Sequence, residues 1–69
     1  MSIKETNLYN ATIAYYEAQR LEALSSLEIF FSNPVAVADH SNFLDEIKKW
    51  TTTLAEAEEN IQVLKKNFS

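Results

Sequence analysis

The C-terminal half of the chain carries one regular row of apolar positions. Its members recur at alternating steps of four and three residues, and they are Phe43, Ile47, Trp50, Leu54, Ala57, Ile61, Leu64 and Phe68. On an α-helix this heptad spacing places every member on one narrow stripe, which another helix must cover to keep it from water. We call these eight residues the heptad row. The row predicts a helix over about residues 42–67 that packs against a second helix.

The N-terminal half is also apolar at helical spacing, and it predicts a helix over about residues 3–32. An eleven-residue repeat describes its best row, which is Tyr9, Ile13, Tyr16, Arg20, Leu24, Leu27 and Phe31. Eleven residues in three turns lie close to the natural helix period, so this helix is expected to stay nearly straight, whereas a heptad favours a left-handed wrap. We therefore expect a bundle with local irregularity. Within it, the predicted partners of the heptad row are Ile13, Tyr16, Leu24 and Leu27.

The first helix has further apolar residues outside its eleven-residue row. These are Leu8, Tyr15, Ala18 and Ile29. A helix that is apolar on more than one side is usually covered on more than one side. The pattern therefore indicates that the first helix contacts more than one neighbour.

A single proline, Pro34, separates the two predicted helices. The residue before a proline is disfavoured in the α region, so the first helix should end at about residue 32. Ser2 and Glu5 fit a capping box, which places the expected start near residue 3. Whether the second helix runs from Pro34 or restarts near Ser41 stays open, and we favour a restart or a kink. The connection, about residues 33–41, is short enough to make the two helices antiparallel.

Composition supports an all-α fold and limits how that fold can be stabilised. The 69 residues include no glycine and no cysteine, and 46% of them are apolar. Without glycine the tight turns of β-hairpins are disfavoured, and without cysteine no disulfide can form. A lone core of this size gives little net stability. We expect one helical-hairpin domain, residues 1–69, that dimerises into a four-helix bundle, although a different protein could supply the missing helices.

The net charge of −4 disfavours nucleic acid as a partner, because phosphate binding uses clustered lysine and arginine. The lysines form isolated pairs, Lys48-Lys49 beside helix-face carboxylates and Lys65-Lys66 near a helix end. No apolar run has the length of a membrane span, and the first residues lack a signal-peptide pattern. We therefore expect no nucleic-acid or membrane partner and a cytoplasmic location.

No group of residues predicts catalysis, a cofactor or a metal site. Asp39, His40 and Ser41 are adjacent in sequence, whereas the members of a catalytic triad converge from separate parts of a fold. The glutamates within residues 56–59 lack the Glu-x-x-His pairs of di-iron bundles, so a solvated acidic face is expected. The chain is therefore expected not to be an enzyme.

Arg20 interrupts the apolar row of the first helix and has two interpretations. It anchors an acidic partner, or it lies over the row and pairs with a glutamate such as Glu17, which fixes the helix register. We favour pairing, because a polar residue in an apolar row is a well-attested register device.

Apolar residues also gather around the predicted hairpin tip, where polar residues are the norm. They are Ile29, Phe30, Phe31, Val35 and Val37. One interpretation is that the turn folds back and caps the bundle core, and we favour it modestly. The other is an exposed patch that docks on a partner.

Together these features predict a non-enzymatic structural or interaction module that self-associates. The alternative is a small adaptor or inhibitor that binds a different protein through its helix faces or its apolar tip.

Overall fold

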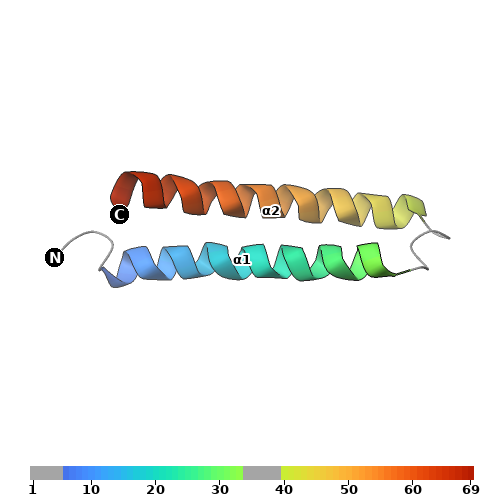
Figure 1. The fold of residues 1–69 in the computed structure, drawn as a ribbon, viewed down its shortest axis with the longest axis horizontal. Coiled ribbons are helices and arrows are strands. Elements are labelled where there is room, and N and C mark those ends of the chain that lie inside the picture. Colours follow the sequence, from blue (N-terminus) through green and yellow to red (C-terminus); the bar gives the residue numbers. More distant parts are fainter. Residues whose placement is uncertain (1–5, 34–39) are drawn as a thin grey trace.

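The computed structural model describes residues 6–33 and 40–69, and within them the chain forms two long helices. Helix α1 spans Asn7–Ser32 and helix α2 spans His40–Phe68. They lie side by side and antiparallel, so that the start of α1 and the end of α2 lie at the same end of the hairpin (Figure 1). The prediction of an all-α helical hairpin is confirmed.

Helix α1 begins later than the sequence suggested. Thr6 is extended, with φ −74° and ψ 147°, and its hydroxyl accepts a hydrogen bond from the Tyr9 N–H at 3.1 Å. This is N-cap geometry, because the side chain satisfies a first-turn donor that has no partner within the helix. The expected start near residue 3 is therefore wrong, and the proposed capping pair Ser2 and Glu5 lies outside the described residues.

Helix α1 ends where the proline predicts. Asn33 is extended, with φ −94° and ψ 111°, as expected for a residue that precedes Pro34. Its backbone N–H donates to the Phe30 carbonyl at 3.4 Å. Helix α2 is described from His40 onward, and the choice between a helix that runs from Pro34 and one that restarts near Ser41 depends on residues outside the described ones.

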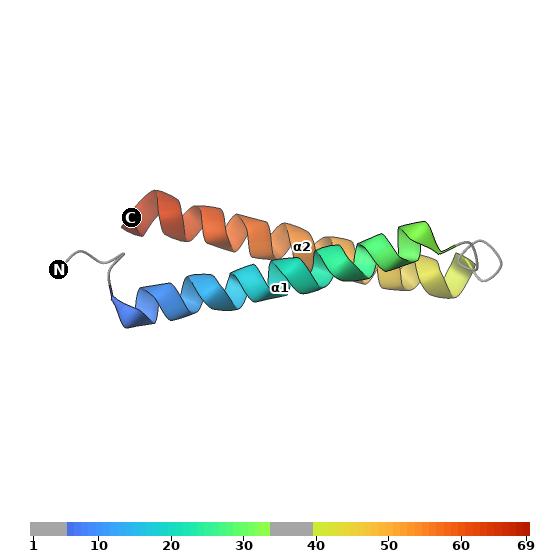
Figure 2. The same ribbon diagram turned by 60° about the horizontal axis from the view of Figure 1, so that its bottom comes forward.

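The buried core is short and lies in the middle of the hairpin. Ala23 and Ala57 are 0% exposed, and Leu27 and Ile61, one turn further along each helix, are 8% exposed. An alanine that one neighbouring helix covers completely requires a close approach of the two backbones. The helices cross at a shallow angle (Figure 2), so this close approach is local.

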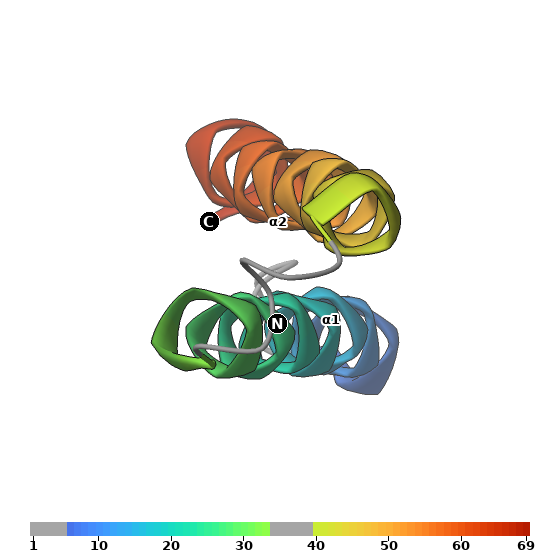
Figure 3. The ribbon, with the colours of Figure 1, turned by 90° about the vertical axis from the view of Figure 1, so that its right-hand side faces the viewer.

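Within residues 6–33 and 40–69 each helix has one helical neighbour, and Figure 3 shows the pair along the hairpin. The molecule measures 54 × 15 × 13 Å and has a radius of gyration of 15.6 Å. A compact domain of this length has a radius of gyration of about 11 Å. The hairpin is therefore a thin rod, in which each helix leaves most of its circumference uncovered.

Candidate interaction surfaces

The contact between α1 and α2 is the first surface to consider. From the heptad row, Ala57 and Ile61 are buried, and Phe43, Ile47, Trp50, Leu54 and Leu64 are half-buried. Phe68 ends the row and is 46% exposed. From α1, Leu27 is buried and Ile13, Tyr16 and Leu24 are half-buried. Burial is thus highest at Leu27, Ala57 and Ile61, and several of the other large side chains predicted to pack remain partly in water.

Two residues of α1 in this contact were missing from the predicted row. Ala23 is completely buried, and Phe30 is half-buried with its ring edge-on to Phe43 at a centroid distance of 5.1 Å. Phe31, the predicted last member of the eleven-residue row, is 71% exposed. The inward-facing row therefore includes Ala23 and Phe30, and Phe31 is the member of the predicted eleven-residue row beyond Arg20 that is exposed, whereas Leu24 and Leu27 are half-buried and buried. Ala23 was missed because alanine is only weakly apolar and so contributes little to an apolar pattern. Its small side chain nevertheless permits the close approach of α1 and α2.

Arg20 lies on one flank of the helix contact, as does Glu17. The Arg20 Nε donates to a Glu17 carboxylate oxygen at 3.3 Å, with the two side chains 32% and 37% exposed. The favoured interpretation, in which Arg20 pairs with a glutamate, agrees with this ion pair. Because both groups are partly solvated, the pair contributes little to stability.

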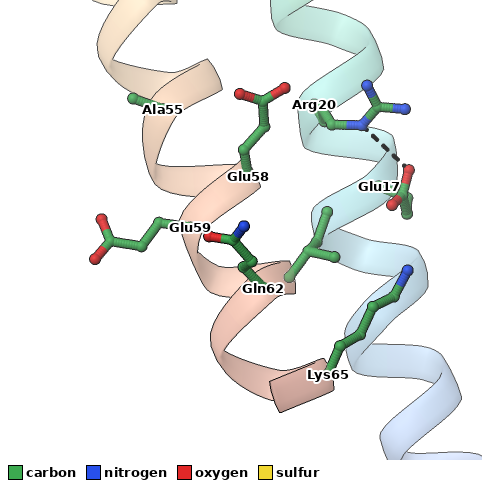
Figure 4. Close-up of a pocket in the computed structure, with 8 residues that line it drawn as sticks. Glu17, Arg20, Ala55, Glu58, Glu59, Gln62 and Lys65 are labelled. Atoms are coloured by element: carbon green, nitrogen blue, oxygen red, sulfur yellow. Dashed lines mark hydrogen bonds and ion pairs between the residues drawn. The ribbon is translucent and has the colours of Figure 1, made fainter.

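An open hollow surrounds this ion pair, as Figure 4 shows. Its α2 side is formed by Ala55, Glu58, Glu59, Ile61, Gln62 and Lys65. Glu59 points away from α1, whereas the Lys65 side chain extends towards it (Figure 4). The charges are mixed and exposed, and the described residues contain no group of three His, Cys, Asp or Glu side chains that could hold a metal ion. The hollow is therefore a solvated flank of the helix contact.

A second hollow lies where the start of α1 meets the end of α2. Leu8, Tyr9 and Thr12 of α1 and Leu64 and Phe68 of α2 contribute to its lining. Leu8 is 80% exposed. Apolar side chains thus continue to this end of the hairpin, where Leu8 remains largely exposed to water.

The hairpin tip combines one packed ring with exposed apolar side chains. Phe30 packs on Phe43, which agrees with a capping role for that residue. Ile29 and Phe31 are 65% and 71% exposed. The other proposed tip residues, Val35 and Val37, lie outside the described residues. The exposed Ile29 and Phe31 agree with the exposed-patch interpretation, whereas the turn on which the capping interpretation depends lies outside the described residues.

The exposed apolar side chains are distributed unequally between the two helices. On α1 they are Leu8, Tyr15, Leu21, Ile29 and Phe31, each more than half exposed. On α2 they are Leu44, Val63 and Phe68, each less than half exposed. Helix α1 has four charged side chains in 26 residues, whereas α2 has nine in 29. The uncovered side of α1 is thus the most apolar outer surface of the described chain.

In the described parts of the chain, neither helix is both long and apolar enough to cross a bilayer. Comparison of the sequence with protein-family models and with curated proteins, and of the fold with solved structures, finds no match.

Proposed function

We propose that this chain is a non-enzymatic structural or interaction module that works by self-association, as a homodimer of hairpins in a four-helix bundle. The observation that carries the proposal is the uncovered apolar side of α1. Leu8, Tyr15 and Ile29 share this side at helical spacing and are each more than half exposed, on a helix with few charges. Contiguous exposed apolar surface on a small protein commonly marks an interface.

The thin shape of the hairpin supports the same proposal. Trp50, Tyr16 and Phe43 remain half-buried after α1 and α2 have packed together. Packing one helix on one helix thus leaves apolar surface in water, and a second hairpin can cover further apolar surface of the rod without requiring another gene product. The cytoplasmic location and the absence of nucleic-acid and membrane partners stay predictions from the sequence.

The test is the molecular mass in solution, measured by light scattering together with helicity across a concentration series. We expect a mass of twice the 7.9 kDa of the chain, and a loss of helicity as dilution drives dissociation. A fully helical species with the mass of one chain at every concentration would contradict the proposal.

A second candidate function is that of an adaptor or inhibitor which docks on a different protein through the tip. The exposed side chains of Ile29 and Phe31 favour it, because they project beside the packed Phe30. Polar replacement of Phe31 should then leave dimer mass and helicity unchanged and abolish binding to the partner. An accompanying loss of helicity would assign Phe31 to the core instead.

A further inference from the structure

Helix α1 carries a second heptad, on the side turned away from α2. Its members follow steps of three and four residues, and they are Leu8, Ala11, Tyr15, Ala18, Glu22, Ser25, Ile29 and Ser32. All eight are exposed. We call these residues the outer row. Five of the eight are apolar and three are polar, so α1 has a second, weaker apolar stripe, as expected of a helix placed between two helical neighbours.

The surface of the outer row has the shape that a facing helix requires. Tyr15, Ala18, Gln19 and Glu22 surround a shallow hollow on α1. Four residues spaced at i, i+3, i+4 and i+7 form the hole that receives one side chain of a neighbouring helix in knobs-into-holes packing. The small Ala18 side chain leaves this hole open to a close approach.

The corresponding position on α2 differs in charge. The hollow there is bordered by Glu59, Gln62, Val63 and Lys66, so two of its four residues are charged. Burying such charges without partners is costly. The hollow on α1 has one charged residue, Glu22, against two on α2, so the outward side of α1 is the better suited of the two to a helix contact.

The exposed area matches what a second copy of the chain would cover. The chain exposes 5143 Å². Compact monomers of its mass expose about 4400 Å², so the excess is about 700 Å² per chain. Standard specific interfaces bury about 800 Å² per partner. A symmetric contact between two copies would therefore remove approximately the surface by which the hairpin exceeds a compact monomer.

The outer row is complementary to itself when two copies run antiparallel. A two-fold axis at the middle of α1, near residue 20, overlaps the helices along their full length. It also pairs each larger residue with a small one of the second copy: Leu8 with Ser32, Ile29 with Ala11, Tyr15 with Ser25 and Glu22 with Ala18. Each facing pair then has a similar combined side-chain volume, so the two helices can keep a constant separation along their length.

A parallel pair would be less well matched. Each residue would then meet itself, so Tyr15 would face Tyr15 and Ala18 would face Ala18, and the separation of the helices would have to alternate. The two Glu22 carboxylates would share one layer. In the antiparallel pair they lie about 6 Å apart along the axis, given a rise of 1.5 Å per residue. Size and charge thus both favour the antiparallel arrangement.

We infer that the outer row of α1 is the self-association surface, and that it pairs antiparallel with the outer row of a second copy. The two α1 helices then lie together at the centre of a flattened four-helix assembly, with the α2 helices outside. This inference rests on the proposed self-association, and it names the face and the direction of the contact.

Two matched replacements of an alanine by arginine test which face forms the dimer contact. Ala18→Arg places a long cation in the outer row, and Ala55→Arg makes the same change at an exposed position of α2. Both replacements favour the helix, so intrinsic helicity is preserved. We expect Ala18→Arg to raise the dimer dissociation constant by about 100-fold, because an unpaired charge would be buried, and Ala55→Arg to leave it unchanged.

The outcomes separate this inference from the proposed function. A dimer that survives Ala18→Arg overturns the outer-row contact, and the proposed self-association still stands because the wild-type chain is dimeric. A wild-type chain that stays monomeric overturns both.

The direction of the contact is tested without touching the interface, which covers the case that the Ala18→Arg chain fails to fold. Spin labels are attached to Lys66→Cys and, in a second sample, to Glu56→Cys, both exposed positions of α2. Glu56 is next to Ala55, which lines the same hollow as Arg20, so it lies near the level of the two-fold axis. In the antiparallel dimer the Lys66 labels are about 30 Å apart along the axis, whereas the Glu56 labels are nearly level. If the distance between the two labels is the same at position 66 as at position 56, the pair is parallel and the inference is overturned.

Discussion

Ala57→Leu distinguishes the observed structure from the heptad pattern alone. Ala57 is a member of the heptad row, and leucine is among the best residues at such a position when it has room. A pattern-based argument therefore expects this substitution to stabilise the protein. The structure gives the opposite expectation, because the Ala57 side chain is already 0% exposed at the close approach of α1 and α2.

The size of the effect follows from the packing. A leucine adds three carbon atoms where Ala57 and Ala23 leave no exposed surface. Inserting extra methylene groups into a filled contact typically costs about 1–3 kcal/mol. The local separation of α1 and α2 would have to increase, which would also weaken the burial of Leu27 and Ile61. We therefore expect a loss in the upper part of that range.

The assay is urea unfolding followed by helical circular dichroism at one fixed protein concentration, because dissociation makes stability concentration-dependent. With a slope of about 1 kcal/mol per molar urea for a small protein, the midpoint should fall by about 2 M. Ala55→Leu is the matched control: it makes the same change two residues away at an exposed position and should shift the midpoint little. A higher midpoint for Ala57→Leu than for the wild type would refute the close approach.

Three further substitutions have definite expected outcomes. Ile61→Asp should abolish most of the helical signal, because it buries an unpaired carboxylate at an 8% exposed position, and retention of full helicity and mass would show that the core is misplaced. Thr6→Ala should cost about 1 kcal/mol in the same urea experiment, since the Tyr9 N–H loses its acceptor; an unchanged midpoint would contradict the N-cap. Glu22→Gln should tighten the dimer by about fivefold in sedimentation experiments at low salt, because two like charges near the two-fold axis are removed. That gain should shrink as salt is added, and a weaker dimer would argue that Glu22 lies elsewhere.

The two helices differ in how their apolar residues are distributed around the helix axis. Helix α2 is amphipathic, with its large apolar residues directed mainly to α1 and most of its nine charges on exposed positions. Helix α1 has apolar residues around most of its circumference, and α2 can cover one side of it. Packing in the hairpin therefore covers the main apolar stripe of α2 but only one apolar side of α1. Both proposals concern the side of α1 that stays uncovered.

Much of the fold is determined by local features of the sequence. Periodicity in α2 defines both the helix and the face it buries, because a single stripe of large residues leaves one way to remove them from water. The steric effect of Pro34 on Asn33 sets the end of α1, and the lack of glycine excludes most alternatives to helices. The residues of the heptad row could therefore be assigned to one helix contact from their spacing alone.

The inward face of α1 was decided by the tertiary structure. With apolar residues on several sides, the sequence of α1 permits more than one buried stripe, and the largest residues suggested a row ending in Phe31. The crossing of the two helices instead brings their backbones close at Ala23 and turns Phe30 inward, so that Phe31 becomes exposed. Spacing along one helix defines which residues share a stripe, whereas the distance between two helices decides whether a large or a small side chain fits between them.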